Sequence, residues 1–332
     1  MFFSLIIPVF NRPDEIEELL ESLTLQTYVQ DYEIVIIEDG SSVTCSDVVY
    51  KYNERLDISY YYKENSGPGD SRNYGMGKAK GDYFIILDSD CIIPPVYLAN
   101  VAKSLEADYV DCFGGPDAAL DSFSKVQKAI NFTMTSFLTT GGIRGKSEKI
   151  EKFQPRSFNM GLSKTAFEAS GGFGDIHPGE DPDLSIRLWK LGYRTRLFTD
   201  CYVYHKRRID WEKFNKQVSK FGKARPILDL WHPEYKKLTF LFPSLFIIGF
   251  IFSLVLMLIN IKFFLYIYIL YAVLVLIASA VANNSLHIGF LSVVALAIQF
   301  YGYGTGYIQS FVKIHLLRQK PQEAFPELFF KK

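Results

Sequence analysis

The sequence has no excess of charge and few cysteines. Its 332 residues include 36 lysines and arginines against 36 aspartates and glutamates, so the formal net charge is zero. The four cysteines form no CxxC pair, and three lie in or beside apolar runs typical of strands. A disulfide-rich module and a zinc-binding spacing are therefore excluded; four thiols could form two disulfides, but we expect buried free thiols. The hydrophobic content of 48% also excludes a disordered or collagen-like chain.

One long stretch of the sequence almost lacks charge. Between Leu238 and Val312 the only charged residue is Lys262, apart from His287. Three apolar segments fit there, and the first two have the roughly 20 residues that a helix needs to cross a bilayer. A buried helical core is the alternative, but a long core helix of a soluble protein would keep one polar face. The three segments are Leu238–Ile259, Phe263–Ala282 and Leu286–Val312.

The third segment leaves the number of membrane crossings open. Its apolar centre, Ile288–Phe300, has 13 residues and is followed by glycines and tyrosines, so it fits a span or a partly re-entrant helix. By the positive-inside rule, Lys236 and Lys237 place the preceding domain in the cytoplasm. Three spans would put the basic tail outside, and two would keep it inside. Either count predicts a multi-pass protein of the inner, cytoplasmic membrane.

The first part of the chain alternates apolar strand-like runs with helical patterns. Helices are expected to begin at Pro13 and at Gly67-Pro68-Gly69. This rhythm predicts an α/β fold with a mainly parallel, Rossmann-like sheet and helices on both faces. In such sheets ligands bind outside the carboxyl ends of the strands, where Glu38-Asp39 and Asp88-Ser89-Asp90 fall. The expected strands are Ser4–Val9, Tyr32–Ile37, Ile58–Tyr62, Tyr83–Leu87, Tyr109–Phe113 and Thr195–Tyr204.

Three side chains near strand ends are candidate metal ligands. Asp88 and Asp90, one residue apart after a buried run, can share a hard cation that bridges phosphate oxygens. His205 closes an expected strand and is a candidate third ligand. The alternatives are an ordinary aspartate-rich turn and a structural histidine.

Two further segments combine structural and functional possibilities. Asp181 fits the N-cap of a helix with Pro182 at its first position, and a carboxylate fixed in this way can also act as a general base. Apolar residues from Trp211 to Phe221 recur at helical spacing with lysines between them. They predict a basic amphipathic helix at the membrane interface, with an ordinary surface helix as the alternative.

Seven short motifs follow one another between residue 2 and about residue 225. They are Ile7–Arg12, Ile37–Ser41, Gly67–Gly75, Leu87–Asp90, Asn159–Leu162, Gly171–Phe173 and Gly179–Asp181. In this order they resemble the family-2 glycosyltransferases, which are inverting enzymes of the GT-A fold that use nucleotide-sugar donors. Members with C-terminal membrane helices are similar to the apolar part of this chain as well.

The resemblance implies a role for each matching position. Pro8, Val9, Glu38 and Asp39 would hold the nucleoside base, most often uracil, and Arg72 would approach the nucleotide. Asp88 would contact the ribose or the metal, Asp90 would bind Mn²⁺ or Mg²⁺ with the diphosphate, and His205 would lie near that metal. Asp181 would be the general base. The region Phe113–Gly161 and the interfacial helix would receive the acceptor, with contacts assigned to Glu180, Asn159, Gly161, Trp211 and Arg225.

Two departures from the family pattern affect the expected substrate. Glu38 stands where the family usually has aspartate, and the Gln-x-x-Arg-Trp motif of processive synthases is absent. We therefore expect limited sugar addition from a UDP-sugar to a lipid-linked or membrane-proximal glycan, as in cell-envelope or polysaccharide biosynthesis. Membrane lipid is an expected partner and nucleic acid is not.

The sequence leaves two other functions open. A nucleotidyltransferase is disfavoured because Ile6–Arg12 contains no glycine to form a phosphate-binding loop. A non-catalytic, membrane-anchored nucleotide-sugar-binding subunit is the other alternative. The predicted parts are a GT-A domain over 1–209, an interfacial helix and linker over 210–236, two or three transmembrane helices over 237–314 and a basic tail over 315–332.

Overall fold

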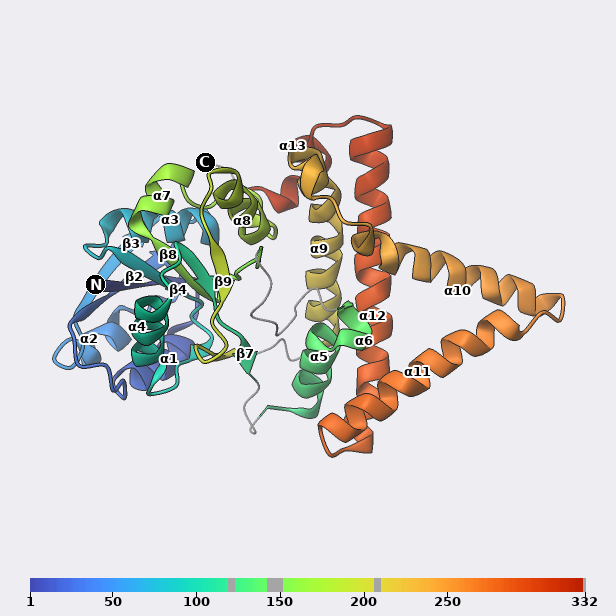
Figure 1. The fold of residues 1–332 in the computed structure, drawn as a ribbon, viewed down its shortest axis with the longest axis horizontal. Coiled ribbons are helices and arrows are strands. Elements are labelled where there is room, and N and C mark those ends of the chain that lie inside the picture. The colour runs from blue at the N-terminus through green and yellow to red at the C-terminus, as the bar shows by residue number, and fades with distance from the viewer. Residues whose placement is uncertain (119–122, 142–151, 206–209, 331–332) are drawn as a thin grey trace. The chain divides into compact units, whose positions relative to one another are not determined.

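The computed structural model describes residues 1–118, 123–141, 152–205 and 210–330, which form two compact units (Figure 1). Within the described residues, the first unit comprises 1–118, 152–205 and 329–330, and the second comprises 123–141 and 210–328. Residues 123–141 therefore group with the helices, although they lie inside the stretch predicted as the GT-A domain. Lys331 and Lys332 of the predicted basic tail, and part of the expected acceptor region, lie outside the described residues.

The first unit is built on a seven-stranded sheet with the order β3-β2-β1-β4-β8-β6-β9. Strands β1 to β4 are mutually parallel, whereas β8 runs antiparallel to both β4 and β6. A second sheet has the order β5-β10-β7. The strands are β1 Phe3–Val9, β2 Tyr32–Asp39, β3 Ile58–Lys63, β4 Tyr83–Leu87, β5 Cys91–Ile92, β6 Cys112–Gly114, β7 Asp117–Ala118, β8 Asn159–Ser163, β9 Thr195–Leu197 and β10 Val203–His205.

Helices cover both faces of the large sheet, because its central strands are apolar on both sides. Alternate residues of β1 enter two different cores: Leu5 and Ile7 pack with one set of helices, and Ile6 packs with the other. The mainly parallel α/β fold is confirmed. On one face lie α1 Pro13–Leu23, α2 Ser46–Tyr52 and α4 Tyr97–Ala107; on the other lie α3 Pro68–Lys78, α7 Lys164–Ser170 and α8 Glu180–Lys190.

Several local predictions were wrong. The strand expected over Tyr109–Phe113 is the shorter β6, Cys112–Gly114. The single strand expected over Thr195–Tyr204 is two strands, because β9 pairs with β6 in the large sheet and β10 pairs with β5 and β7 in the small one. Asp181 does not cap α8. Gly179, with φ 132°, takes the N-cap position, and Asp181 falls in the first turn. The four cysteines are buried and free, as predicted.

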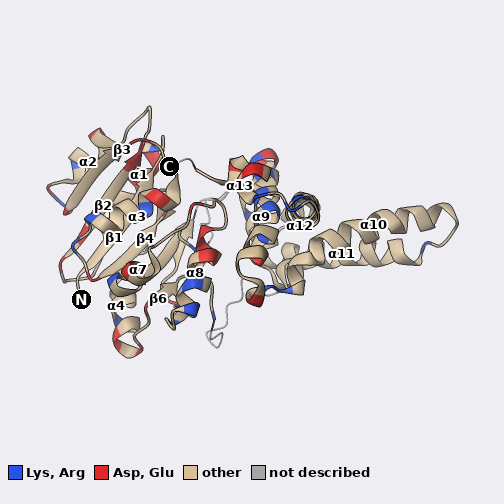
Figure 2. Ribbon diagram, turned by 90° about the horizontal axis from the view of Figure 1, so that it is seen from above, with Lys and Arg blue, Asp and Glu red and all other residues tan. Residues whose placement is uncertain are grey.

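The second unit is helical. Helices α9 and α12 lie side by side along much of their length, and α10 and α11 form a hairpin that carries almost no charge (Figures 1 and 2). Three helical segments are long and apolar enough to cross a membrane: Leu238–Leu258, Phe263–Ala282 and Leu286–Leu316. The helices are α5 Lys125–Thr135, α6 Phe137–Thr140, α9 Trp211–Trp231, α10 Phe242–Leu258, α11 Phe263–Ala282, α12 Leu286–Phe311 and α13 Pro321–Ala324; the short turns are η1 Pro233–Tyr235, η2 Leu238–Leu241, η3 Val312–Leu316 and η4 Pro326–Leu328.

The predicted amphipathic helix is present as α9. Its apolar residues Phe214 and Val218 are buried in one cluster with Ile130 and Met134 of α5 and Ala295 of α12. The apolar face of α9 is therefore covered by neighbouring helices of the same unit.

Candidate active site

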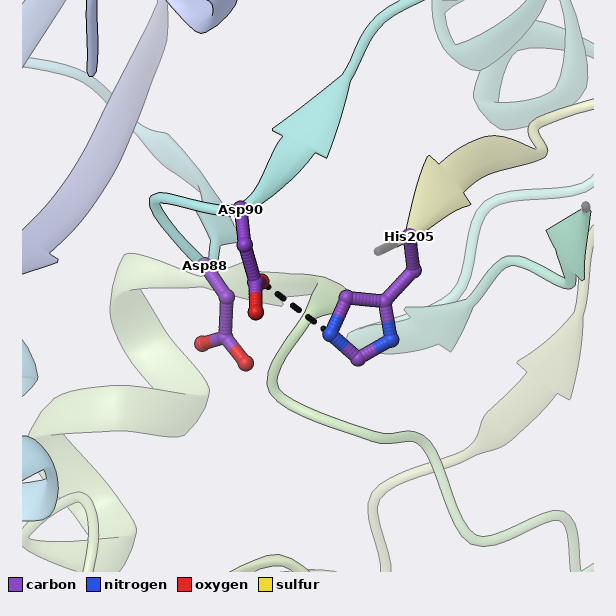
Figure 3. Close-up of side chains that lie close together, drawn as sticks. All are labelled: Asp88, Asp90 and His205. Atoms are coloured by element: carbon purple, nitrogen blue, oxygen red, sulfur yellow. Dashed lines mark ion pairs between the residues drawn. The ribbon is translucent and has the colours of Figure 1, made fainter. Parts of the chain in front are cut away.

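Asp88, Asp90 and His205 come together because two short strands pair next to the end of β4. Asp88 and Asp90 lie in the turn between β4 and β5, and β10 runs antiparallel to β5 with His205 opposite Cys91. The His205 Nε2 atom lies 3.1 Å from Asp90 Oδ1, and Figure 3 shows the imidazole facing that carboxylate. The ring of Phe158 stacks on the imidazole at 4.8 Å between centroids, which fixes its orientation.

This cluster has the composition of a divalent-cation site. One ligand atom from each of Asp88, Asp90 and His205 lies within 4.8 Å of the others. All three side chains are partly exposed, so an ion and its other ligands could reach them. Carboxylate oxygens with one imidazole nitrogen suit Mn²⁺, and the carboxylates also suit Mg²⁺. The residues therefore fit the expected metal.

Arg72 joins the cluster to the start of α8. Its Nη2 donates to Asp88 Oδ1 at 2.8 Å, and its Nη1 lies 3.4 Å from Glu180 Oε1. The guanidinium is only 4% exposed. Burial alone would lower the pKa of Arg72, but the carboxylates of Asp88, Glu180 and Asp181 outweigh it and raise the pKa. Arg72 thus stays cationic between three acids.

The neighbours Glu180 and Asp181 have opposite electrostatic surroundings. Glu180 accepts from its neighbour Gly179 N at 2.8 Å and lies 2.7 Å from His177 Nδ1. Burial opposes its ionisation, but His177 and Arg72 overcome it and lower the pKa of Glu180 to about 2.

Burial, reinforced by the charge of Glu180, raises the pKa of Asp181 to about 6. Among the described residues, Asp181 Oδ1 has no hydrogen-bond partner. A carboxylate with a pKa close to neutrality is suited to accept a proton at physiological pH.

Glu38 and Asp39 lie at the end of β2, but protein groups already occupy their oxygens. Glu38 is fully buried, and it accepts from the Ser41 hydroxyl, from Cys45 N at 2.8 Å and from Tyr60 Oη at 3.1 Å. It therefore holds the loop after β2 in place, and its predicted contact with a nucleoside base stays a prediction.

Asp39 plays the same part for the next loop. It accepts from Lys63 Nζ at 2.8 Å and from the backbone amides of Ser66 and Gly67 at 3.0 Å. These contacts fix the chain that leads into α3, on which Arg72 lies. Pro8 and Val9, also predicted at the base-binding site, are buried in β1.

Two other predicted contacts, Asn159 and Gly161, lie in β8, which pairs with β4 so that Asn159 is opposite Leu87, the residue before Asp88. Asn159 is fully buried in β8, where Oδ1 accepts from Tyr97 Oη at 2.6 Å and Nδ2 donates to Cys201 O at 2.8 Å. Gly161, in the same strand, leaves room for the ring of Phe113. Both residues pack the sheet.

Trp211 and Arg225, the remaining predicted contacts, belong to α9 in the second unit. Trp211 packs at the cluster between α9 and α5. The Arg225 guanidinium lies 3.3 Å from the centroid of the Phe240 ring.

Two residues of this region were not identified from the sequence. Arg12 pairs with Glu15 at 2.7 Å and lies 3.7 Å from Asp90 Oδ2. Arg12 is the last residue of the first motif, Ile7–Arg12, and this position is the feature of the sequence from which it could have been identified. His177 precedes Glu180 by three residues, but its contact depends on the turn that leads into α8, which no sequence pattern indicated.

Comparison with known proteins decides the family. Residues 4–171, half of the chain, match the family described as Glycosyl transferase family 2. The chain belongs to glycosyltransferase family 2. It is 25% identical to the chondroitin synthase of Escherichia coli over 235 residues, covering 61% of this chain and 34% of that protein. It is also 32% identical over 114 residues to the poly(ribitol-phosphate) beta-N-acetylglucosaminyltransferase TarS of Staphylococcus aureus, covering 33% and 20%. The chain thus spans about a third or less of the length of these relatives.

A solved structure of similar fold covers nearly the whole chain. The mannosyltransferase PcManGT from Pyrobaculum calidifontis, in complex with GDP-Man and Mn²⁺, has a TM-score of 0.57 at 17% identity, covering 96% of this chain and 88% of that one. The match confirms the fold of this family-2 chain.

Proposed function

We propose that this family-2 protein is an inverting glycosyltransferase that moves a sugar from a nucleotide-sugar donor to an acceptor hydroxyl. The observation that carries the proposal is the Asp88, Asp90 and His205 cluster, joined through Arg72 to the acidic start of α8. It combines a cation site for a diphosphate with a candidate base of raised pKa. A UDP-sugar is the proposed donor, on the family resemblance.

The proposed reaction is a single displacement. The acceptor oxygen bonds to the anomeric carbon, the bond from that carbon to the diphosphate breaks, and its electron pair leaves with the nucleoside diphosphate. Asp181 takes the proton that the acceptor hydroxyl loses, because its ionised form is available near neutral pH.

The groups around the leaving diphosphate have the complementary charge. Asp88, Asp90 and His205 would hold Mn²⁺ or Mg²⁺, which supplies positive charge to offset the developing negative charge. Arg72 adds a fixed cation beside Asp88. Glu180 positions Arg72 and raises the basicity of Asp181, so it acts through its neighbours.

We further propose an acceptor at the membrane. The apolar α10–α11 hairpin supports a membrane-bound enzyme, with its α/β unit facing the cytoplasm at the inner membrane and a lipid-linked or membrane-proximal glycan as acceptor. The predicted part boundaries at 209, 236 and 314 remain proposals in this scheme.

The test separates donor binding from catalysis. UDP binding to the detergent-purified full chain is measured with and without Mn²⁺, together with release of UDP from UDP-sugars, for the wild type and for Asp181→Asn. We expect Mn²⁺-dependent binding in both proteins and a loss of turnover of about 10²- to 10⁴-fold in the variant. Asp82→Asn, the same change at an exposed site, is the matched control.

Three outcomes would contradict the proposal. Loss of UDP binding in Asp181→Asn would make this residue a donor ligand instead of the base. If Asp181→Asn keeps the full rate of turnover, Asp181 is not the general base. A wild-type protein that binds UDP but releases none from any UDP-sugar would favour the non-catalytic binding subunit.

A further inference from the structure

We infer that the chain crosses the membrane twice, through the α10–α11 hairpin, and that α12 stays on the side of the α/β unit. The three apolar helices alone leave two and three crossings open. Two crossings are favoured by contacts at the two ends of the helical region and by contacts along α12 itself. The inference concerns the lipid bilayer as a partner and does not depend on the proposed reaction.

The first argument is the parity of the crossings. The chain leaves the α/β unit after His205 and rejoins it at Phe329. There Phe329 forms a β-bridge with Ile176, and the Phe330 ring packs directly over Gly67 and lies 6.0 Å from the His177 ring. Two segments of one folded unit lie on one side of a membrane. The helices between them must therefore cross an even number of times.

The second argument is the surface of α10 and α11. Both helices have the length of a bilayer span and expose apolar side chains around their circumference; Ile251 is 56% and Leu270 59% exposed. The turn between them carries Lys262 and Asn260, so full insertion would bring these polar groups to the far interface. A hydrocarbon environment accounts for this apolar surface. If α10 and α11 both cross the membrane, the number of crossings is two, which is even.

The third argument is what covers α12. At its middle, Ala295 is fully buried, in contrast to the exposed apolar side chains of the two hairpin helices. Ala295 packs on α5, and the Thr133 hydroxyl of α5 lies 3.5 Å from Ser292 O. Helix α5 has 11 residues, about 16 Å, which is too short to follow α12 across a bilayer.

A second helix that covers α12, α9, is equally unsuited to hydrocarbon. Gly302 lies against Asn215 and Val218 of α9 so closely that a Cβ atom would meet them at 2.6 and 2.7 Å. On the same stretch of α9, Lys213 and Lys216 are 62% and 70% exposed. If α12 spanned the membrane, these ammonium groups would lie within the lipid, at a high cost.

Single-cysteine labelling of the full chain in native membranes tests the topology. A membrane-impermeant maleimide is applied to right-side-out and inside-out vesicles carrying Lys51→Cys in the α/β unit, Ile261→Cys at the hairpin turn or Gln319→Cys after α12. All three positions are exposed. The wild type is the blank, because its four thiols are buried.

We expect Gln319→Cys to be labelled from the same face as Lys51→Cys, and Ile261→Cys from the opposite face. Labelling of Gln319→Cys from the face opposite to Lys51→Cys would establish three crossings and overturn the inference. Labelling of Ile261→Cys from the face of Lys51→Cys would mean that the hairpin does not cross, and would also overturn it. Gln322→Cys repeats the decisive measurement if the first variant is not produced. A protein inactive as a glycosyltransferase would give the same labelling.

Discussion

The acidic pairs at the carboxyl ends of β2 and β4 occupy similar places in the sheet but have different surroundings. At the end of β2, Glu38 and Asp39 accept hydrogen bonds from backbone amides and from neighbouring side chains. At the end of β4, Asp88 and Asp90 lie beside His205 in a partly exposed cluster. The first pair holds the loops of the site, and the second has the composition and partial exposure that the proposed cation site requires. Position at a strand end alone does not distinguish these roles; the partners of each carboxylate do.

The same contrast recurs within one pair at the start of α8. Glu180 is buried among His177, Arg72 and the Gly179 amide, whereas Asp181 Oδ1 has no hydrogen-bond partner among the described residues. The carboxylate with many partners has the lowered pKa, and its neighbour has the raised one. The Glu180 charge that its partners stabilise is one cause of the basicity of Asp181.

The largest expected effect on UDP binding comes from the acidic pair at the proposed cation site. Asp90→Asn removes a charge from the proposed cation site and should weaken Mn²⁺-dependent UDP binding by at least about tenfold, because loss of even a supporting group at a metal site has effects of 10- to 100-fold. Titration of UDP binding against Mn²⁺ measures it. An unchanged Mn²⁺ dependence would show that the cluster does not hold the ion.

For the pair at the end of β2 we expect the opposite: a loss of stability without a change in metal dependence. Glu38→Gln replaces an acceptor for Cys45 N and Tyr60 Oη with a neutral amide, which should lower the free energy of unfolding by about 1–3 kcal/mol. The Mn²⁺ dependence of UDP binding should stay the same. Thermal unfolding of Glu38→Gln and Asp90→Asn side by side gives the comparison. A Glu38→Gln protein of normal stability that loses UDP affinity would make Glu38 a direct ligand of the base.

The Glu180–Asp181 pair predicts the pH dependence of turnover. Asp181 must be ionised to accept a proton, and its pKa is about 6, so kcat/KM should rise about tenfold between pH 5 and pH 7 and level off above that. The pH profile of kcat/KM of the wild type is measured together with its UDP affinity at each pH, so that a change in donor binding can be separated from a change in catalysis. A rate that falls as the pH rises to 7 would be incompatible with Asp181 as the base.

The raised pKa of Asp181 also has a consequence for stability. The folded state holds this proton up to about pH 6, whereas an unfolded aspartic acid loses it near its ordinary value of 3.8. Stability from this group is therefore present at low pH and is lost as the pH rises through 6. Asp181→Asn, which keeps the neutral form, should accordingly unfold no earlier than the wild type at pH 8.

The sequence was sufficient to predict those strands and site residues that are marked by an apolar run or by a position directly after one. The apolar runs of β1, β2 and β4 identified the parallel core, and Asp88 and Asp90 were found because they follow such a run. His205 was predicted as a ligand, although the strand before it was misjudged. Strand β8 was not identified, since Asn159–Ser163 is short and contains polar residues whose burial depends on distant partners such as Tyr97.

The roles of the carboxylates could not be predicted in the same way. Glu38 and Asp88 are both acidic residues after an apolar run, and only the folded loop shows that Cys45 N and Tyr60 Oη reach Glu38. The contact between His177 and Glu180 likewise depends on the turn before α8. Each of these pairings is a tertiary fact that sequence spacing does not encode.

The smallest expected effect concerns His177, which touches Glu180 and none of the candidate ligands of the cation. His177→Phe removes the hydrogen bond to Glu180 Oε1, so Glu180 should hold Arg72 less firmly. We expect the KM for the donor to rise about 2- to 10-fold, the equivalent of one hydrogen bond, with little change in kcat. His177→Asn is the matched variant, because an amide nitrogen can replace Nδ1. If the Asn variant restores the KM and the Phe variant does not, the hydrogen bond positions Arg72; equal values for both would mean that the packing of the ring, and not its nitrogen, is what matters at this position.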